Sequence, residues 1–300
     1  MSVILKVLRE GENKPNPLTI CIIANPALEA PWQTGQFMPD PIAGNEIAFN
    51  SSCEYIVNSI FGRLPDQRES FMADPNIESR IRVVSLFAPG LSAEDKNSLV
   101  AQDSASNLLV ARRTKFKSFL AAHGIVPDVA YAVSASITHT RATAWYTSDD
   151  DSKGGIDFDL DGQVLCHRFF NLIPGTVAIH SSANSLTALH EFGHAFSSYT
   201  NGKIVDLYVD GEVGVNNKHG RPIPDVFAIY GGTAISSDKE RNGVKYPPGW
   251  ISFHGKLRTP EFPAAMDDYW LAHDGVPNHC QHDVITRSFL TDRLLAKLSR

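Results

Sequence analysis

The chain has 300 residues, of which 43% are hydrophobic and 20% are charged, so it is long enough to bury one large core or two smaller ones. Its net charge of −6 comes without any block of like charges. This excludes a basic face that could follow a phosphate backbone, and nucleic acid is not an expected partner. No run approaches the roughly eighteen apolar residues that a membrane-spanning helix needs, so no membrane partner is expected.

The first ten residues carry charges inside their apolar stretch and contain no small-residue cleavage site, unlike a signal peptide. A cytoplasmic location is therefore expected. The four cysteines lie far apart and predict neither a disulfide-rich scaffold nor a cysteine-based zinc site. Cys21, inside an apolar run, is expected to be a buried thiol.

The first half of the chain predicts alternating strands and helices. Apolar runs predict strands at 18–24, 80–87 and 128–133. Helical spacing predicts a helix at 46–61, based on Ile47, Tyr55, Ile56 and Ile60, and another at 107–123 that ends at Gly124. This order predicts an α/β fold.

The second half predicts less regular structure. Residues 155–161 and 164–170 resemble a hairpin around an Asp-Gly turn, and 177–180 is a short strand. Residues 201–263 predict packed loop. A final helix at 284–298 carries apolar residues at helical spacing, namely Ile285, Phe289, Leu290, Leu294, Leu295 and Leu298. We interpret 1–300 as a single catalytic unit, with an N-terminal α/β lobe (1–200) and a loop-rich C-terminal lobe (201–300).

The sequence His190-Glu191-Phe192-Gly193-His194 matches the H-E-x-x-H pattern of zinc sites. Residues four apart share one face of a helix, so both imidazoles can reach a single ion at about 2.0–2.1 Å. Glu191 is then placed to hydrogen-bond a water on that ion and to act as its general base. The pattern predicts a Zn²⁺-dependent hydrolase.

The flanking residues independently predict the helix that this motif needs. Ser182 or Asn184 is a candidate N-cap, and 201–202 (Asn-Gly) is a candidate end. An apolar stripe lies between these limits and consists of Leu186, Leu189, Phe192 or Gly193, and Phe196.

The stretch 189–196 (LHEFGHAF) resembles the bacterial zinc peptidases of the IgA-peptidase-like family, in which HEFGHxF leads to an Asp-x-Tyr. The resemblance is strongest over about 176–208. It implies a metzincin-like zincin, with an α/β catalytic core, a mixed sheet, the active-site helix at its edge and an irregular C-terminal lobe closing the cleft. It also implies a peptide or protein substrate.

A catalytic zinc generally has three protein ligands and one open position, so the two histidines need a third partner. The Asp-x-Tyr of the resemblance selects Asp206, which Asp206-Leu207-Tyr208 would supply after a turn at Gly202. Glu212 is the alternative, because it lies 18 residues past His194, close to the spacing of gluzincins. The choice between these two candidates for the third ligand remains open.

Other roles are implied by the resemblance alone. Tyr208 or Tyr269 would steady the oxyanion of the tetrahedral intermediate, a role that zincins give to a Tyr or His. Met266 would form the methionine turn beneath the metal, although a core methionine is an equally good interpretation.

The predicted function is peptide-bond hydrolysis, with an extended substrate paired by strand addition to the strand that ends at His180. Two alternatives stay open: a non-catalytic binding protein with the zincin fold, and a zinc hydrolase that acts on a non-peptide amide. The motif specifies how water is activated and does not identify the group that is cleaved.

Overall fold

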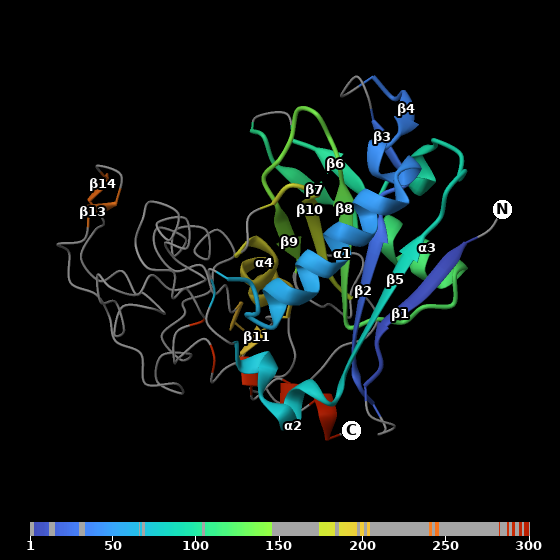
Figure 1. The fold of residues 1–300 in the computed structure, drawn as a ribbon. Helices are drawn as coiled ribbons and strands as arrows, with labels where there is room; N and C mark the ends of the chain where they lie inside the picture. The colour runs from blue at the N-terminus through green and yellow to red at the C-terminus, as the bar shows by residue number, and fades with distance from the viewer. Residues whose placement is uncertain are drawn as a thin grey trace.

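The computed structural model describes residues 3–11, 16–29, 34–65, 67, 70–103, 106–145, 174–183 and 186–196, together with 199–200, 203–204, 240–241, 244–245, 282, 287, 290–291, 294–295 and 297–299. These residues are built around a six-stranded mixed sheet (Figure 1). The mixed sheet with helices confirms the predicted α/β class.

The sheet has the strand order β1-β5-β2-β8-β10-β9. Its four central strands run parallel to one another and its two edge strands run antiparallel to their neighbours. The strands are β1 (Ile4–Arg9), β2 (Leu18–Ala24), β5 (Ile81–Phe87), β8 (Val129–Ser134), β9 (Thr143–Trp145) and β10 (Gly175–His180). Four two-stranded pairs accompany it: β3 (Ala27–Glu29) with β4 (Phe37–Pro39), β6 (Val100–Gln102) with β7 (Leu109–Ala111), β11 (Tyr199–Thr200) with β12 (Lys203–Ile204), and β13 (Glu240–Arg241) with β14 (Val244–Lys245).

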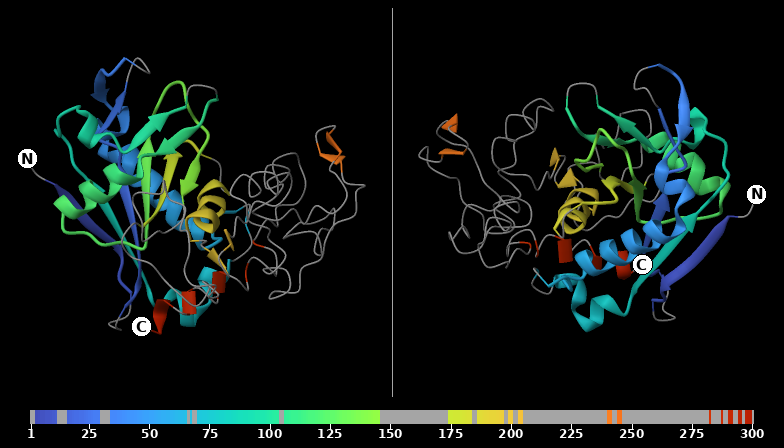
Figure 2. Two further views of the ribbon diagram at one scale, coloured as in Figure 1. Left: turned by 180° about the vertical axis from the view of Figure 1, so that it is seen from behind. Right: turned by 45° about the horizontal axis from the view of Figure 1, so that its top comes forward.

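Helices cover both faces of the sheet (Figures 1 and 2). The α-helices are α1 (Glu46–Ile60), α2 (Pro75–Glu78), α3 (Arg113–Ala122) and α4 (Thr187–Phe196), and the 3₁₀ turns are η1 (Pro41–Gly44), η2 (Phe71–Ala73) and η3 (Asp95–Asn97). The buried residues of α1 and α4 belong to the core on one face, and those of α3 to the core on the other. Alternation along β2 feeds both cores, with Ile20 and Ile22 in the first and Cys21 and Ile23 in the second.

Two helix predictions needed correction in detail. Helix α1 forms over the predicted range, but Ile47 is 81% exposed. Its buried stripe is instead Phe49, Cys53, Ile56 and Ile60, which is the set that follows helical spacing.

The helix predicted at 107–123 is a strand followed by a shorter helix. Residues Leu109–Ala111 form β7, because they pair with Val100–Gln102 and bury Leu109 and Ala111. Helix α3 then begins at Arg113. Gly124 has a φ of 67°, so it ends this helix as expected.

Asp40 joins two strand ends at the carboxyl edge of the sheet. Among the parallel strands β5-β2-β8-β10, β2 comes first in the chain, followed by β5, β8 and β10. The order in which strands are added therefore reverses between β2 and β8. The Asp40 carboxylate accepts hydrogen bonds there from Asn25 (2.9 Å), from the Ser134 hydroxyl (2.6 Å) and from the Ala135 amide (2.9 Å). Burial raises the pKa of Asp40, and these donors lower it.

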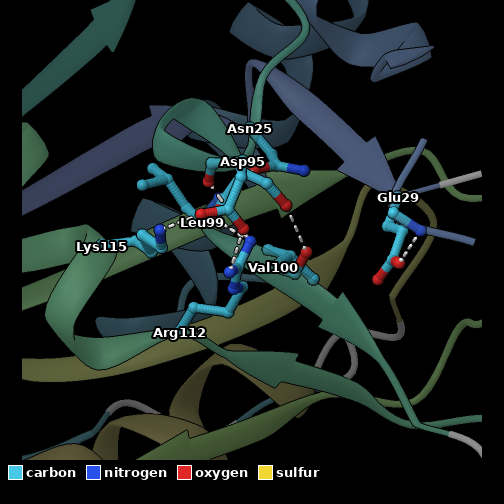
Figure 3. Close-up of polar contacts among 9 residues, drawn as sticks. Asn25, Glu29, Asp95, Leu99, Val100, Arg112 and Lys115 are labelled. Carbon is cyan, nitrogen blue, oxygen red and sulfur yellow. Dashed lines mark hydrogen bonds and ion pairs between the residues drawn. The ribbon is translucent and has the colours of Figure 1, made fainter. Parts of the chain in front are cut away.

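The same edge is tied to the α3 side of the sheet by two further contacts. The Asn25 side-chain oxygen accepts a hydrogen bond from the Leu99 amide at 3.0 Å (Figure 3). The Asp95 carboxylate pairs with Arg112 and Lys115 at the beginning of α3 (Figure 3). Because these three side chains are partly exposed, their ion pairs contribute little to the stability of the fold.

The C-terminal residues lie at the other end of the sheet, where its central parallel strands begin. The described residues between Arg287 and Leu298 are helical, and the rest of the predicted 284–298 helix lies outside the described residues. Leu290, Leu294 and Leu298 are buried in the core on the α1 face, whereas Leu295, predicted on the same stripe, is 50% exposed. The C-terminal residues therefore belong to the same core as the sheet.

Among the residues that the structure describes, no helix is both long enough and apolar enough to cross a membrane. The hairpin predicted at 155–170 and most of the predicted loop at 201–263 lie outside those residues.

Candidate active site

The motif lies on helix α4, which runs back along β10 and also packs against β9 and α1 (Figure 1). Close approach of helix and strand depends on Gly175, the first residue of β10. A Cβ atom at this position would lie 2.1 Å from the carbonyl oxygen of Ala195. Only glycine fits between the strand and the last turn of the helix.

The structure corrects the predicted ends of this helix. Ser182 is not its N-cap, because the helix begins at Thr187 and the Ser182 hydroxyl instead contacts Nδ1 of His180 at 2.7 Å. Asn184 lies outside the described residues. The helix ends at Phe196, before the predicted 201–202, because Tyr199–Thr200 already pairs with Lys203–Ile204.

The predicted apolar stripe of α4 is confirmed. Four side chains of the helix and its approach are fully buried: Leu186, Leu189, Phe192 and Phe196. The rings of Phe192 and Phe196 stack with their centroids 5.4 Å apart. Burial of this stripe fixes which way the rest of the helix surface points.

His190 and His194 come together as the motif predicts. Their Nε2 atoms lie 3.2 Å apart, and the planes of the two rings make an angle of 77°. His190 is buried and His194 is half-buried. Two nitrogens at this separation can each lie about 2.05 Å from one ion, with an N–ion–N angle of about 103°, close to the tetrahedral value of about 109°. The pair therefore fits a zinc ion.

Glu191 is a buried carboxyl group beside these rings. Burial raises its pKa to about 7, while the positive charges of His194 and Arg141 lower it. A buried carboxyl group with a shifted pKa beside two imidazoles is typical of a functional site.

The sequence interpretation missed Tyr131, which lies in the strand predicted at 128–133. This side chain is fully buried in β8, and its hydroxyl donates a hydrogen bond to the carbonyl oxygen of Ala188 on α4 at 2.9 Å. The signal was present in the sequence: a tyrosine in an otherwise apolar buried strand must find an acceptor for its hydroxyl.

The other predicted site residues are not placed. Asp206, Tyr208 and Tyr269 lie outside the described residues, as do Glu212 and Met266. Within the part of the chain that the structure describes, no third His, Cys, Asp or Glu completes a metal-binding group. The third ligand stays a prediction, with Asp206 and Glu212 as the two candidates.

The strand ending at His180, with which the substrate is predicted to pair, already has a neighbour on each side. This strand is β10, which is hydrogen-bonded to β8 on one side and to β9 on the other. On the β9 side the pairing covers Thr176–Ala178 and does not reach Ile179 or His180, so most of this edge is used within the sheet. The outermost strand on this side of the sheet is β9, which was not predicted from the sequence.

No model of a known protein family matches this chain, and no curated protein matches its sequence.

Proposed function

We propose that this protein is a zinc-dependent peptidase with a zincin-like core, in which His190 and His194 bind the metal and Glu191 is the general base. The observation that carries the proposal is the 3.2 Å separation of the two Nε2 atoms on one side of a buried helix, with a buried carboxyl group between them in sequence. Asp206 is the proposed third ligand, and Tyr208 or Tyr269 the proposed oxyanion donor.

A zinc ion bound here would supply a Lewis acid that acidifies water and polarises the carbonyl to be attacked. The chain supplies the proton transfers. Glu191 would accept a proton from the attacking water and deliver it to the nitrogen of the leaving amine. Burial raises the pKa of this carboxyl group, whereas a bound cation would favour its charged, accepting form.

The surroundings of α4 support a peptide substrate. Strand β9 is the antiparallel edge strand of the sheet and packs beside the helix that carries the motif. An extended peptide backbone is commonly bound by adding a strand to such an edge. We propose β9, in place of β10, as the strand that aligns the substrate.

The first experiment measures zinc in the purified full-length chain by mass spectrometry after dialysis against zinc. We expect equimolar zinc in the wild type and its loss in His190→Ala and in His194→Ala. The matched control is His139→Ala, because both nitrogens of that ring are already used, by the Thr138 hydroxyl at 2.7 Å and the Asp103 carbonyl at 2.9 Å. Zinc in the double variant His190→Ala/His194→Ala would refute the metal site.

The second experiment measures hydrolysis of a quenched fluorescent peptide library. Wild type should cleave it, while Glu191→Gln should keep its zinc and lose at least about a thousandfold in kcat. Cleavage by Glu191→Gln at the parent rate would refute the mechanism. Equimolar zinc with no hydrolysis by wild type would favour a binding protein or a hydrolase of non-peptide amides over a peptidase.

A further inference from the structure

Tyr131 connects the centre of the sheet to the beginning of the active-site helix. It lies opposite Ile22 on one neighbouring strand and Val177 on the other, and its ring is fully buried on the α4 face. Its hydroxyl donates to the Ala188 carbonyl at 2.9 Å. A hydroxyl buried among apolar groups is costly without such a partner, so this bond specifies where the helix can sit.

The bond acts at one end of α4, and Gly175 allows close contact with the sheet at the other end. Ala188 lies in the first turn of the helix and Ala195 in its last, where the missing side chain of Gly175 allows contact with β10. His190, Glu191 and His194 all lie between Ala188 and Ala195. A helix fixed at both ends can neither rotate nor slide along the sheet, and its side chains keep their positions.

Glu191 lies three residues after Ala188, so the two share one side of the helix. The pKa of Tyr131 is raised well above its ordinary value, first by burial and then by the charge of Glu191, which supports the same placement.

We propose that Tyr131 is a positioning residue of the active site, whose hydroxyl holds the first turn of α4 through Ala188 and thereby sets Glu191 and the two histidines against the substrate. This rests on the proposed function. This role requires no contact between Tyr131 and the metal or the substrate. Its effect is transmitted through the helix backbone.

The test is Tyr131→Phe in the full-length, zinc-loaded chain, because this change keeps the buried ring and removes only the hydroxyl. The matched control is Ser98→Ala, which also removes a buried hydroxyl that donates to a backbone carbonyl, that of Val100 at 3.0 Å, near the α3 side of the sheet. Hydrogen exchange of the α4 amides is measured in both variants, together with zinc content, kcat and KM for the peptide probe.

We expect the α4 amides of Tyr131→Phe to exchange about fivefold faster than in wild type, which is the effect of one lost hydrogen bond. Zinc should stay equimolar and KM unchanged, while kcat falls about tenfold because Glu191 is less well aligned. Ser98→Ala should leave α4 exchange and kcat at wild-type values.

Wild-type exchange of α4 in Tyr131→Phe would overturn the proposal, because the hydroxyl would then not hold the helix. Faster exchange with an unchanged kcat would overturn it as well, because the held position would not matter to the reaction. If wild type itself bound no zinc and cleaved nothing, the proposed function would fail. The exchange measurement would still decide whether Tyr131 holds α4.

Discussion

The ammonium group of Lys297 lies 3.3 Å from a carboxylate oxygen of Asp128, and both side chains are almost completely buried. Asp128 immediately precedes β8, and its second carboxylate oxygen accepts a hydrogen bond from the Thr19 amide at 2.8 Å. The guanidinium of Arg80 donates to the carbonyl of Leu298 beside it. These contacts attach the end of the chain to the amino ends of two central strands.

Lys297→Met should destabilise the fold by about 3 kcal/mol at pH 7, because it leaves the Asp128 carboxylate buried without its cation. The measurement is the free energy of unfolding in urea. The matched control is Lys115→Met, which breaks the exposed pair with Asp95 and should cost at most about 1 kcal/mol. Equal losses in the two variants would show that the buried pair has no special importance.

Asp128 should make stability depend on pH. Burial raises its pKa from 3.8 to about 6, although Lys297 and the Thr19 amide lower it. A raised folded-state pKa means that the stabilising contribution is complete below about pH 4 and is lost as the pH rises through about 6. The loss is on the order of 3 kcal/mol.

The comparison that isolates this group is wild type against Asp128→Asn, unfolded in urea at several pH values from 4 to 7. Wild type should lose stability relative to the variant as the pH rises across this range, because asparagine does not titrate. Parallel stability curves would contradict the assignment to Asp128.

Gly175→Ala should displace α4 from the sheet. The added methyl group would lie 2.1 Å from the Ala195 carbonyl oxygen, so the helix or the strand must move, at a cost of about 3 kcal/mol. Thermal unfolding and zinc content are the measurements. Gly44→Ala is the matched control, because a Cβ at that position has no atom within 4 Å. A Gly175→Ala protein as stable as Gly44→Ala would refute the packing described for α4.

The third zinc ligand can be identified by substitution. Asp206→Ala should lose zinc and Glu212→Ala should keep it, since a catalytic site needs a third protein ligand and the resemblance selects Asp206. Asp210→Ala, from the same segment, is the control for nonspecific effects. Retention of zinc by Asp206→Ala and its loss from Glu212→Ala would reverse the assignment.

Local patterns predicted the parts of the fold that depend on local physics. The apolar run of β2 was predicted with its observed bounds. This central strand is buried over nearly its whole length, so its sequence is apolar over the same range. The pairing of His190 with His194 followed from the geometry of one helical turn.

Features set by distant segments could not be predicted in the same way. Strand β1 has charged residues among apolar ones and forms because β5, more than seventy residues later, pairs with it. By contrast, Ile47 on α1 was misjudged although helical spacing already indicated the stripe of Phe49, Cys53, Ile56 and Ile60. Tyr131 and Ala188 are 57 residues apart, and no spacing rule connects them.

The buried hydrogen bonds of Asp40 link the loop after β2 to the loop after β8. Neither loop can open without breaking bonds that hold the other, so the two should unfold together as one cooperative unit. Amides in both loops would then report a single opening free energy, although more than ninety residues separate Asp40 from Ser134 along the chain.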